Sequence, residues 1–354
     1  MPIAPAAPES ESVAPPPAPR DPPAPPARPL AAWPGAGPLI RLARHSRARA
    51  IAQWTIIGLI LLGFGVAVAR EWDQVQHYRW QVAPGYLLAG ILLTVARGPV
   101  VLEGWREVLA RLGYRLRWTQ AVRVYFTSGM AKYLPGSLWF AVGRVLLAEQ
   151  AGVPKRVSSV SIGLETALII VAAMTASSLG LTALAGMPIW PYLIVLAALL
   201  VFLLWPAPFF ALLNWGLVRA GFTAVDVRLG WRDLAAVLPA FLANWLVYGL
   251  ISYCWTAAVY PGLAPSDLPG LTGLFAAAWV VGFLAVVVPL GVGVREGIVV
   301  TGLIALLHLP LAAAGAAAVL SRLGSILGEA LWAGIAIRLK PRDQGQGTTN
   351  RAGP

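Results

Sequence analysis

Apolar runs of roughly transmembrane length recur along most of this chain and are separated by short polar loops. A helix needs about 20 apolar residues to cross a membrane, so these runs predict an all-α, polytopic membrane protein. We predict about eight transmembrane helices, the third of them short, at residues 52–69, 82–102, 119–133, 157–184, 191–217, 234–260, 271–288 and 311–337.

Two further apolar segments, residues 138–147 and 297–307, are too short to cross the membrane comfortably. Each follows a break that is rich in proline and glycine. Interrupted helices are tolerated inside a membrane where protein or a watery cavity surrounds their exposed backbone groups. We therefore predict two short broken or re-entrant helices in addition to the spans.

The composition agrees with a membrane protein. Only 12% of the 354 residues are charged, whereas a soluble domain carries about a quarter, so a soluble enzyme is excluded. The net charge of +12 comes from arginines beside the apolar runs, and we expect no nucleic-acid partner. The single cysteine, Cys254, lies in an apolar run, and no histidine has a metal-ligand residue three or four positions after it. We predict no metal and no cofactor.

The basic residues also predict the orientation of the chain. Arginines gather at residues 41–49, before the first span, and basic residues follow the last span at 338–342. Basic loops stay in the cytoplasm, so both termini are predicted to be cytoplasmic. Residues 1–50, rich in Pro, Ala and Arg, and residues 341–354 are predicted disordered tails around a membrane domain at 51–340. The excess of arginine over lysine, 24 to 3, is typical of a GC-rich genome, and we expect a bacterial inner membrane.

Two parts of the chain resemble each other, at about residues 119–186 and 271–337. In each, a Pro/Gly break is followed by an arginine, a short apolar helix, a proline and a long helix with an embedded charge. Loop charges place Pro135 near the outer side and Pro289 near the inner side, which predicts an inverted repeat, the architecture of many transporters. The alternative is coincidence, because Pro-Gly breaks are common in membrane helices and the proline-to-arginine spacing differs, nine residues against six.

The two breaks carry a family resemblance. Lys-Tyr-Leu-Pro-Gly at 132–136, and Pro-Leu-Gly-Val-Gly-Val-Arg-Glu at 289–296 with Ser321-Arg322, resemble the lysylphosphatidylglycerol synthase transmembrane-domain family, over about residues 50–340. That family includes the flippase half of the multiple peptide resistance factor, and its bifunctional members add a soluble acyltransferase domain. This chain ends at Pro354 without that domain, so the resemblance implies the lipid-translocating part and no synthase activity.

Arg144 and Arg295 are the leading candidates for a binding site, because each follows a helix-breaking glycine inside an apolar region. A guanidinium near a helix N-terminus suits a phosphate, since it offers a fork of donors and a fixed charge. The alternative is structural: Arg144 pairs with Glu165 or Glu149, and Arg295 pairs with Glu296, to hold the fold.

Small and polar residues form stripes at helical spacing on two of the long helices. One stripe holds Ser158, Ser161 and Glu165, and the other runs from Gly315 through Arg322 to Glu329. They predict either a path for a lipid headgroup or close helix packing. Arg97 and Lys132 lie nearer the ends of predicted spans, where basic side chains reach for the interface. The predicted substrate-binding set is Arg144, Arg295, Glu296, Glu165, Arg322, Ser161, Gly291 and Gly293.

Three functions are open at this point. The first is a flippase-like transporter of a phospholipid or another lipid-linked headgroup, with membrane lipids as its partners. The second is a membrane enzyme that uses a lipid-linked donor, since Glu71 and Asp73 resemble the acidic pair of such glycosyltransferases. The third is a non-transporting scaffold for lipid- or glycan-synthesis enzymes. We favour the first.

Overall fold

In a computed structural model, the described residues are 72–133, 139–185, 190–219, 229–285 and 291–339, with isolated positions between 55 and 69. All regular secondary structure in this part of the chain is helical. Its elements are α3 (Trp72–His77), α4 (Pro84–Arg111), α5 (Trp118–Gly129), η2 (Met130–Tyr133), α6 (Trp139–Gln150), α7 (Lys155–Ala185), α8 (Trp190–Leu204), α9 (Ala207–Arg219), α10 (Trp231–Ala257), η3 (Pro265–Asp267), α11 (Leu268–Leu284), α12 (Val294–Leu307) and α13 (Leu311–Arg338).

Within the described residues, five helical segments are long and apolar enough to cross a membrane, and a bent pair could supply a sixth. The five are α4, α7, α10, α11 with η3, and α13. The predicted count of eight is therefore not reached in this part of the chain. The first predicted span, 52–69, and both predicted tails lie essentially outside the described residues.

The bent pair corrects the prediction of one continuous span at 191–217. Helices α8 and α9 meet at an angle of 76°, with Trp205 and Pro206 between them. Proline has no backbone N–H and is tolerated at the start of a helix, so Pro206 ends α8 and begins the next helix in a new direction. The Phe210 N–H donates to the Pro206 carbonyl at 3.1 Å, which marks that new start.

The predicted short span at 119–133 does not form a helix long enough to cross a membrane. Helix α5 has 12 residues, which at 1.5 Å per residue is about 18 Å, well short of a hydrocarbon core of about 30 Å. The chain continues as the single 3₁₀ turn η2 and then returns through α6. Both predicted short elements are present as helices, as α6 and α12.

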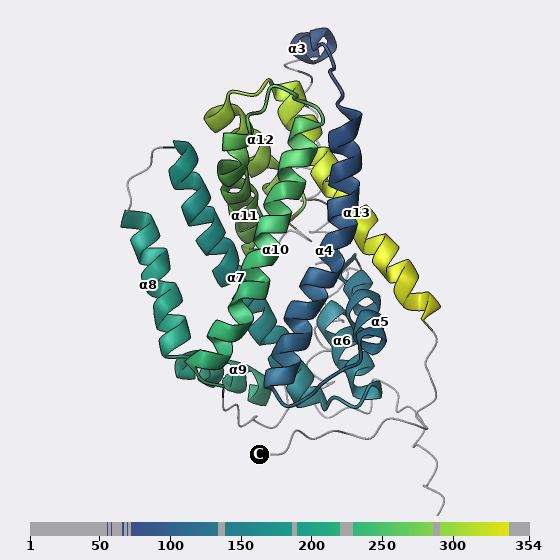
Figure 1. Ribbon diagram of the computed structural model, residues 1–354, viewed down its shortest axis with the longest axis vertical. Coiled ribbons are helices and arrows are strands. Elements are labelled where there is room, and N and C mark those ends of the chain that lie inside the picture. The colour runs from purple at the N-terminus through teal and green to yellow at the C-terminus, as the bar shows by residue number, and fades with distance from the viewer. Residues whose placement is uncertain are drawn as a thin grey trace, which may run out of the picture.

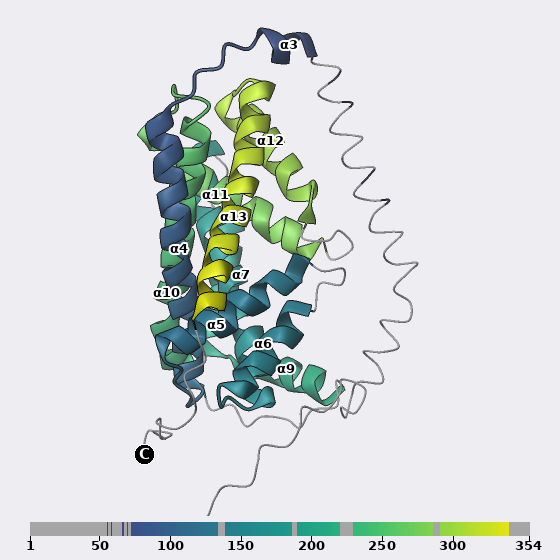
Figure 2. The same cartoon turned by 90° about the vertical axis from the view of Figure 1, so that its right-hand side faces the viewer.

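Two helical hairpins enter the bundle from opposite ends (Figure 1). We name these ends after the helices that lie there, the α3 end and the α9 end. The α5–α6 hairpin starts and finishes at the α9 end, whereas the α11–α12 hairpin starts and finishes at the α3 end (Figure 2). The inner ends of both hairpins lie about halfway between the two ends of the bundle, a level that we call mid-depth. Helix α13 runs past both hairpins and contacts α5 and α12.

The long helices hold the hairpins in place through two apolar cores. The larger core joins α7, α10 and α11, where Leu168, Trp245 and Phe275 are buried. The smaller core joins α4, α5 and α13, around Trp105 and Trp332. Each hairpin thus packs on long helices that reach both ends of the bundle.

Candidate functional site

Helix α13 holds the inner ends of both hairpins through ion pairs. Glu329 accepts hydrogen bonds from Lys132 Nζ at 2.5 Å and from Tyr133 Oη at 2.6 Å, both from η2 at the inner end of the α5–α6 hairpin. Arg322 Nη1 lies 3.5 Å from Glu296 Oε1, at the inner end of the α11–α12 hairpin. Arg322 and Glu329 are two helical turns apart, so both hairpins meet one short stretch of α13.

The sequence predicts that Lys132 reaches for the membrane interface, but the structure shows a different contact. Lys132 is paired inside the protein with a carboxylate 197 residues away. Arg322 and Glu329 of the predicted stripe on α13 both face hairpins.

The glycines before α12 set the geometry of its N-terminus. Gly291 and Gly293 have positive φ angles of 61° and 83°, which L side chains rarely adopt. The Gly293 N–H donates to Glu296 Oε2 at 2.7 Å, so this carboxylate caps the helix. These three predicted site residues shape the turn, while Glu296 also meets Arg322. Residues 286–290, which hold Pro289, lie outside the described residues, as do 134–138 with Pro135.

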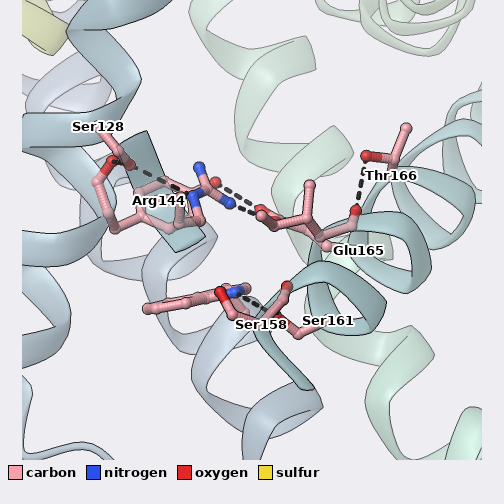
Figure 3. A network of polar contacts seen from close by, with 9 residues as sticks. Ser128, Arg144, Ser158, Ser161, Glu165 and Thr166 are labelled. Atoms are coloured by element: carbon pink, nitrogen blue, oxygen red, sulfur yellow. Dashed lines mark hydrogen bonds and ion pairs between the residues drawn. The ribbon is translucent and has the colours of Figure 1, made fainter. Parts of the chain in front are cut away.

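Arg144 is engaged in a buried network (Figure 3). Its guanidinium forms an ion pair with Glu165 and lies 4.0 Å from the Tyr125 ring centroid. Tyr125 Oη donates to the second Glu165 oxygen at 2.7 Å, and Arg144 Nε donates to Ser128 Oγ at 3.4 Å. The Arg144 and Glu165 side chains are 6% and 5% exposed. Each charge is thus satisfied within the protein, which favours the structural alternative for this pair.

Ser158 and Ser161 lie on the same buried face of α7 as Glu165, as predicted. Ser161 Oγ accepts from Trp105 Nε1 at 3.2 Å and donates to the Ser158 carbonyl at 2.8 Å. Ser161 thus joins α7 to α4, whereas Glu165 joins α7 to α5 and α6 (Figure 3). These contacts favour the close-packing alternative for this stripe.

Arg97 is the site residue that the sequence prediction missed. It lies at the middle of α4, about 20 Å from either end of that helix, so its side chain cannot reach an interface. Its Nε donates to Asn244 Oδ1 at 2.8 Å, and its Cζ lies 4.9 Å from the Tyr248 ring centroid. The hydropathy pattern ended the span at 102, whereas α4 continues to Arg111, and this extra length moves Arg97 to mid-depth.

Arg295 reaches the same tyrosine from α12. Its Nη2 donates to Tyr248 Oη, and its Cζ lies 5.8 Å from the ring centroid. Arg295 is 8% exposed and is not paired with Glu296, contrary to the structural alternative. Among the described residues, neither Arg97 nor Arg295 has a carboxylate within ion-pair distance. We call Arg97 and Arg295 the arginine pair.

Comparison with protein families decides the relationship that the two breaks indicated. The family described as "Lysylphosphatidylglycerol synthase TM region" matches residues 53–332. The chain belongs to this family. The match includes both hairpins, the arginine pair and the two ion pairs on α13. A comparison with curated proteins gives no match.

The features that indicated a lipid-linked enzyme receive no further support. Glu71 and the side chain of Asp73 lie outside the described residues. In the described part of the chain, no three His, Cys, Asp or Glu side chains gather as a metal site would require.

Proposed function

We propose that this member of the lysylphosphatidylglycerol synthase TM region family translocates a lipid headgroup across the membrane. The observation that carries the proposal is the charge at mid-depth. Five basic side chains meet three carboxylates there: Arg97, Lys132, Arg144, Arg295 and Arg322, against Glu165, Glu296 and Glu329. Charged groups inside a membrane are costly, so each of them is a candidate functional residue by default, and the excess of positive charge suits an anionic headgroup.

The two hairpins supply a geometry for alternating access. Residues 118–185 form a hairpin followed by the long helix α7, and residues 268–338 form a hairpin followed by the long helix α13. The two units run in opposite directions through the bundle (Figure 2). We infer that they are the inverted repeat and that rocking of one unit against the other exposes the mid-depth site to each side in turn.

The basic loops support one orientation. Arginines gather at the α9 end, at Arg106, Arg111, Arg115, Arg117 and Arg123. By the positive-inside rule we infer that this end, where α13 ends at Arg338, faces the cytoplasm. The α11–α12 hairpin then enters from the outer side.

The test is a translocation assay with the full chain in lipid vesicles that carry a fluorescent phosphatidylglycerol. A membrane-impermeant reductant bleaches only outer-leaflet label, so translocation shows as bleaching beyond the outer half. We expect this excess with the wild-type protein and with Arg338→Gln, an exposed control at the end of α13, and its loss with Arg295→Gln. Vesicles with wild-type protein that bleach like protein-free vesicles would reject the proposal.

A further inference from the structure

We propose that the arginine pair binds a single phosphate group of a membrane lipid, with Tyr248 as a third donor. This inference rests on the proposed function, since it assumes that a headgroup reaches mid-depth. It also moves the site away from Arg144, whose charge Glu165 already neutralises.

The first support is the number of unused donors. A guanidinium carries five N–H groups. Among the described residues, the hydrogen bonds from these side chains are one from Arg97 to Asn244 and one from Arg295 to Tyr248. The Tyr248 oxygen accepts from Arg295, so its own hydrogen stays available to a ligand. Several donors therefore converge around one ring.

The second support is charge. The guanidinium carbons of Arg97 and Arg295 lie 4.9 Å and 5.8 Å from the centroid of the same ring, that of Tyr248. Two like charges around one ring and away from bulk water repel each other, and an anion between them would offset that repulsion. Glu329 and Glu165 are already engaged by Lys132 and Arg144. Among the described residues, no carboxylate forms an ion pair with either arginine, and an anionic ligand can supply that partner.

The third support is the rigidity of one half of the site. Asn244 and Tyr248 lie one turn apart on α10, and Tyr248 packs edge-on against Trp245 with ring centroids 5.3 Å apart. Asn244 and Tyr248 are 3% and 5% exposed. Arg97 is thus held on a fixed wall made by α4 and α10, while Arg295 belongs to the α11–α12 hairpin.

This arrangement favours phosphate over other ligands. Planar guanidinium forks match pairs of phosphate oxygens, and the charge-assisted hydrogen bonds are about twice as strong as neutral ones. One phosphodiester carries a single negative charge, which the pair can neutralise without a metal ion. An anion bound between Arg97 and Arg295 also joins the α4–α10 wall to the hairpin, so binding and hairpin position are coupled.

The experiment measures binding to the purified full-length protein in a neutral detergent. A short-chain phosphatidylglycerol is titrated by calorimetry, beside inorganic phosphate and an uncharged short-chain diacylglycerol. The variants are Arg97→Gln, Arg295→Gln and Tyr248→Phe, with Arg97→Lys as the charge-conserving variant and Arg338→Gln as the exposed control. Each variant is first checked for a single folded peak by gel filtration.

We expect the phosphatidylglycerol to bind the wild type and the control equally, and diacylglycerol not to bind. Arg97→Gln and Arg295→Gln should each weaken binding about tenfold or more, since each removes charge-assisted hydrogen bonds. Arg97→Lys should recover part of the loss, and Tyr248→Phe should lose less than the glutamine variants. Weak or absent competition by inorganic phosphate identifies the lipid as the source of the phosphate.

Three results would overturn the inference. They are equal binding of diacylglycerol and phosphatidylglycerol to the wild type, unchanged binding in Arg97→Gln, and binding of inorganic phosphate as tight as that of the lipid. The vesicle assay separates this inference from the proposed function. Arginine-dependent binding without translocation rejects transport and keeps the site, whereas unchanged translocation in Arg97→Gln rejects the site and keeps transport.

Discussion

At the scale of single residues, Arg144 and Glu165 depend on each other. Both are buried, and each has hydrogen-bond partners besides the other, Ser128 and Tyr125. Removing one member of a buried pair leaves the other charge without compensation, whereas replacing both with apolar residues is often neutral. The pair therefore stabilises this region only while it is complete.

We expect Glu165→Ala to lower the free energy of unfolding by about 3–5 kcal/mol. The double variant Arg144→Leu/Glu165→Leu should recover most of that loss. Denaturant unfolding in detergent, followed by circular dichroism, measures both. As a control, Arg106→Gln breaks a half-exposed pair with Glu103 and should cost at most about 1 kcal/mol. A double variant as unstable as the single one would contradict a purely structural role for this pair.

Gly291 provides a second residue-scale prediction. Its φ is +61°, and a Cβ there would lie 2.5 Å from the Gly282 carbonyl oxygen. We expect Gly291→Ala to destabilise the protein by more than the roughly 1–2 kcal/mol that left-handed backbone costs, since the clash adds to it. The matched control is Gly315→Ala, in the helix α13, where nothing lies within 4 Å of a Cβ. The same unfolding measurement should show no loss for this control, and equal effects of the two changes would refute the argument.

At the scale of elements, helices α7 and α11 cross at a glycine contact. A Cβ at Gly180 would lie 2.2 Å from the Pro269 carbonyl oxygen and 2.6 Å from Gly273 Cα. Backbones that approach this closely leave no room for a side chain, and small residues at such crossings are common in membrane proteins. This crossing holds the α11–α12 hairpin against α7.

We expect Gly180→Ala to push α11 from α7 and to lower the unfolding midpoint measurably. In Gly216→Ala, in α9, a Cβ meets nothing within 4 Å, so this helix-favouring change should not lower the midpoint. Differential scanning fluorimetry of both variants tests the crossing. An unchanged midpoint for Gly180→Ala would show that the crossing is less tight than described.

The sequence predicts some elements well and others poorly, for physical reasons. Helices α7 and α13, at Lys155–Ala185 and Leu311–Arg338, agree with the predicted spans within two residues, because each is one uninterrupted apolar run. Hydropathy records burial in the membrane but not direction. The hydropathy pattern therefore predicts one continuous span where α8 and α9 are separated by Trp205 and Pro206. It also predicts a span at α5, although the chain returns from α5 through α6.

At the scale of the whole molecule, the site depends on contacts between distant parts of the chain. Lys132 and Glu329 are separated by 197 residues, and Arg97 and Asn244 by 147. A single sequence can mark Arg144, Arg295 and their glycines by local motif, but it cannot show which charge meets which. For this reason the sequence predicts Arg97 and Lys132 near the interface, whereas their partners lie at mid-depth.

The two ion pairs on α13 lead to a prediction about transport. If one repeat rocks against the other, the Lys132–Glu329 pair must form and break once in each cycle, because it joins the α5–α6 hairpin to a helix of the other repeat. Reversing one charge places like charges together and holds the hairpin away from α13. We expect Lys132→Glu and Glu329→Lys each to slow translocation about tenfold or more. A charge-assisted hydrogen bond contributes about 1.5–3 kcal/mol, and about 1.4 kcal/mol corresponds to a factor of ten.

The double variant Lys132→Glu/Glu329→Lys restores opposite charges and should recover much of the wild-type rate in the vesicle assay. Tyr133 donates to the carboxylate at 329 in the wild type, so recovery should be incomplete, because a lysine there cannot accept that hydrogen bond. Unfolding midpoints measured in parallel separate a transport defect from instability. Single variants that transport at the wild-type rate would mean that this contact does not take part in the cycle, and rocking would then have to occur at another surface of the bundle.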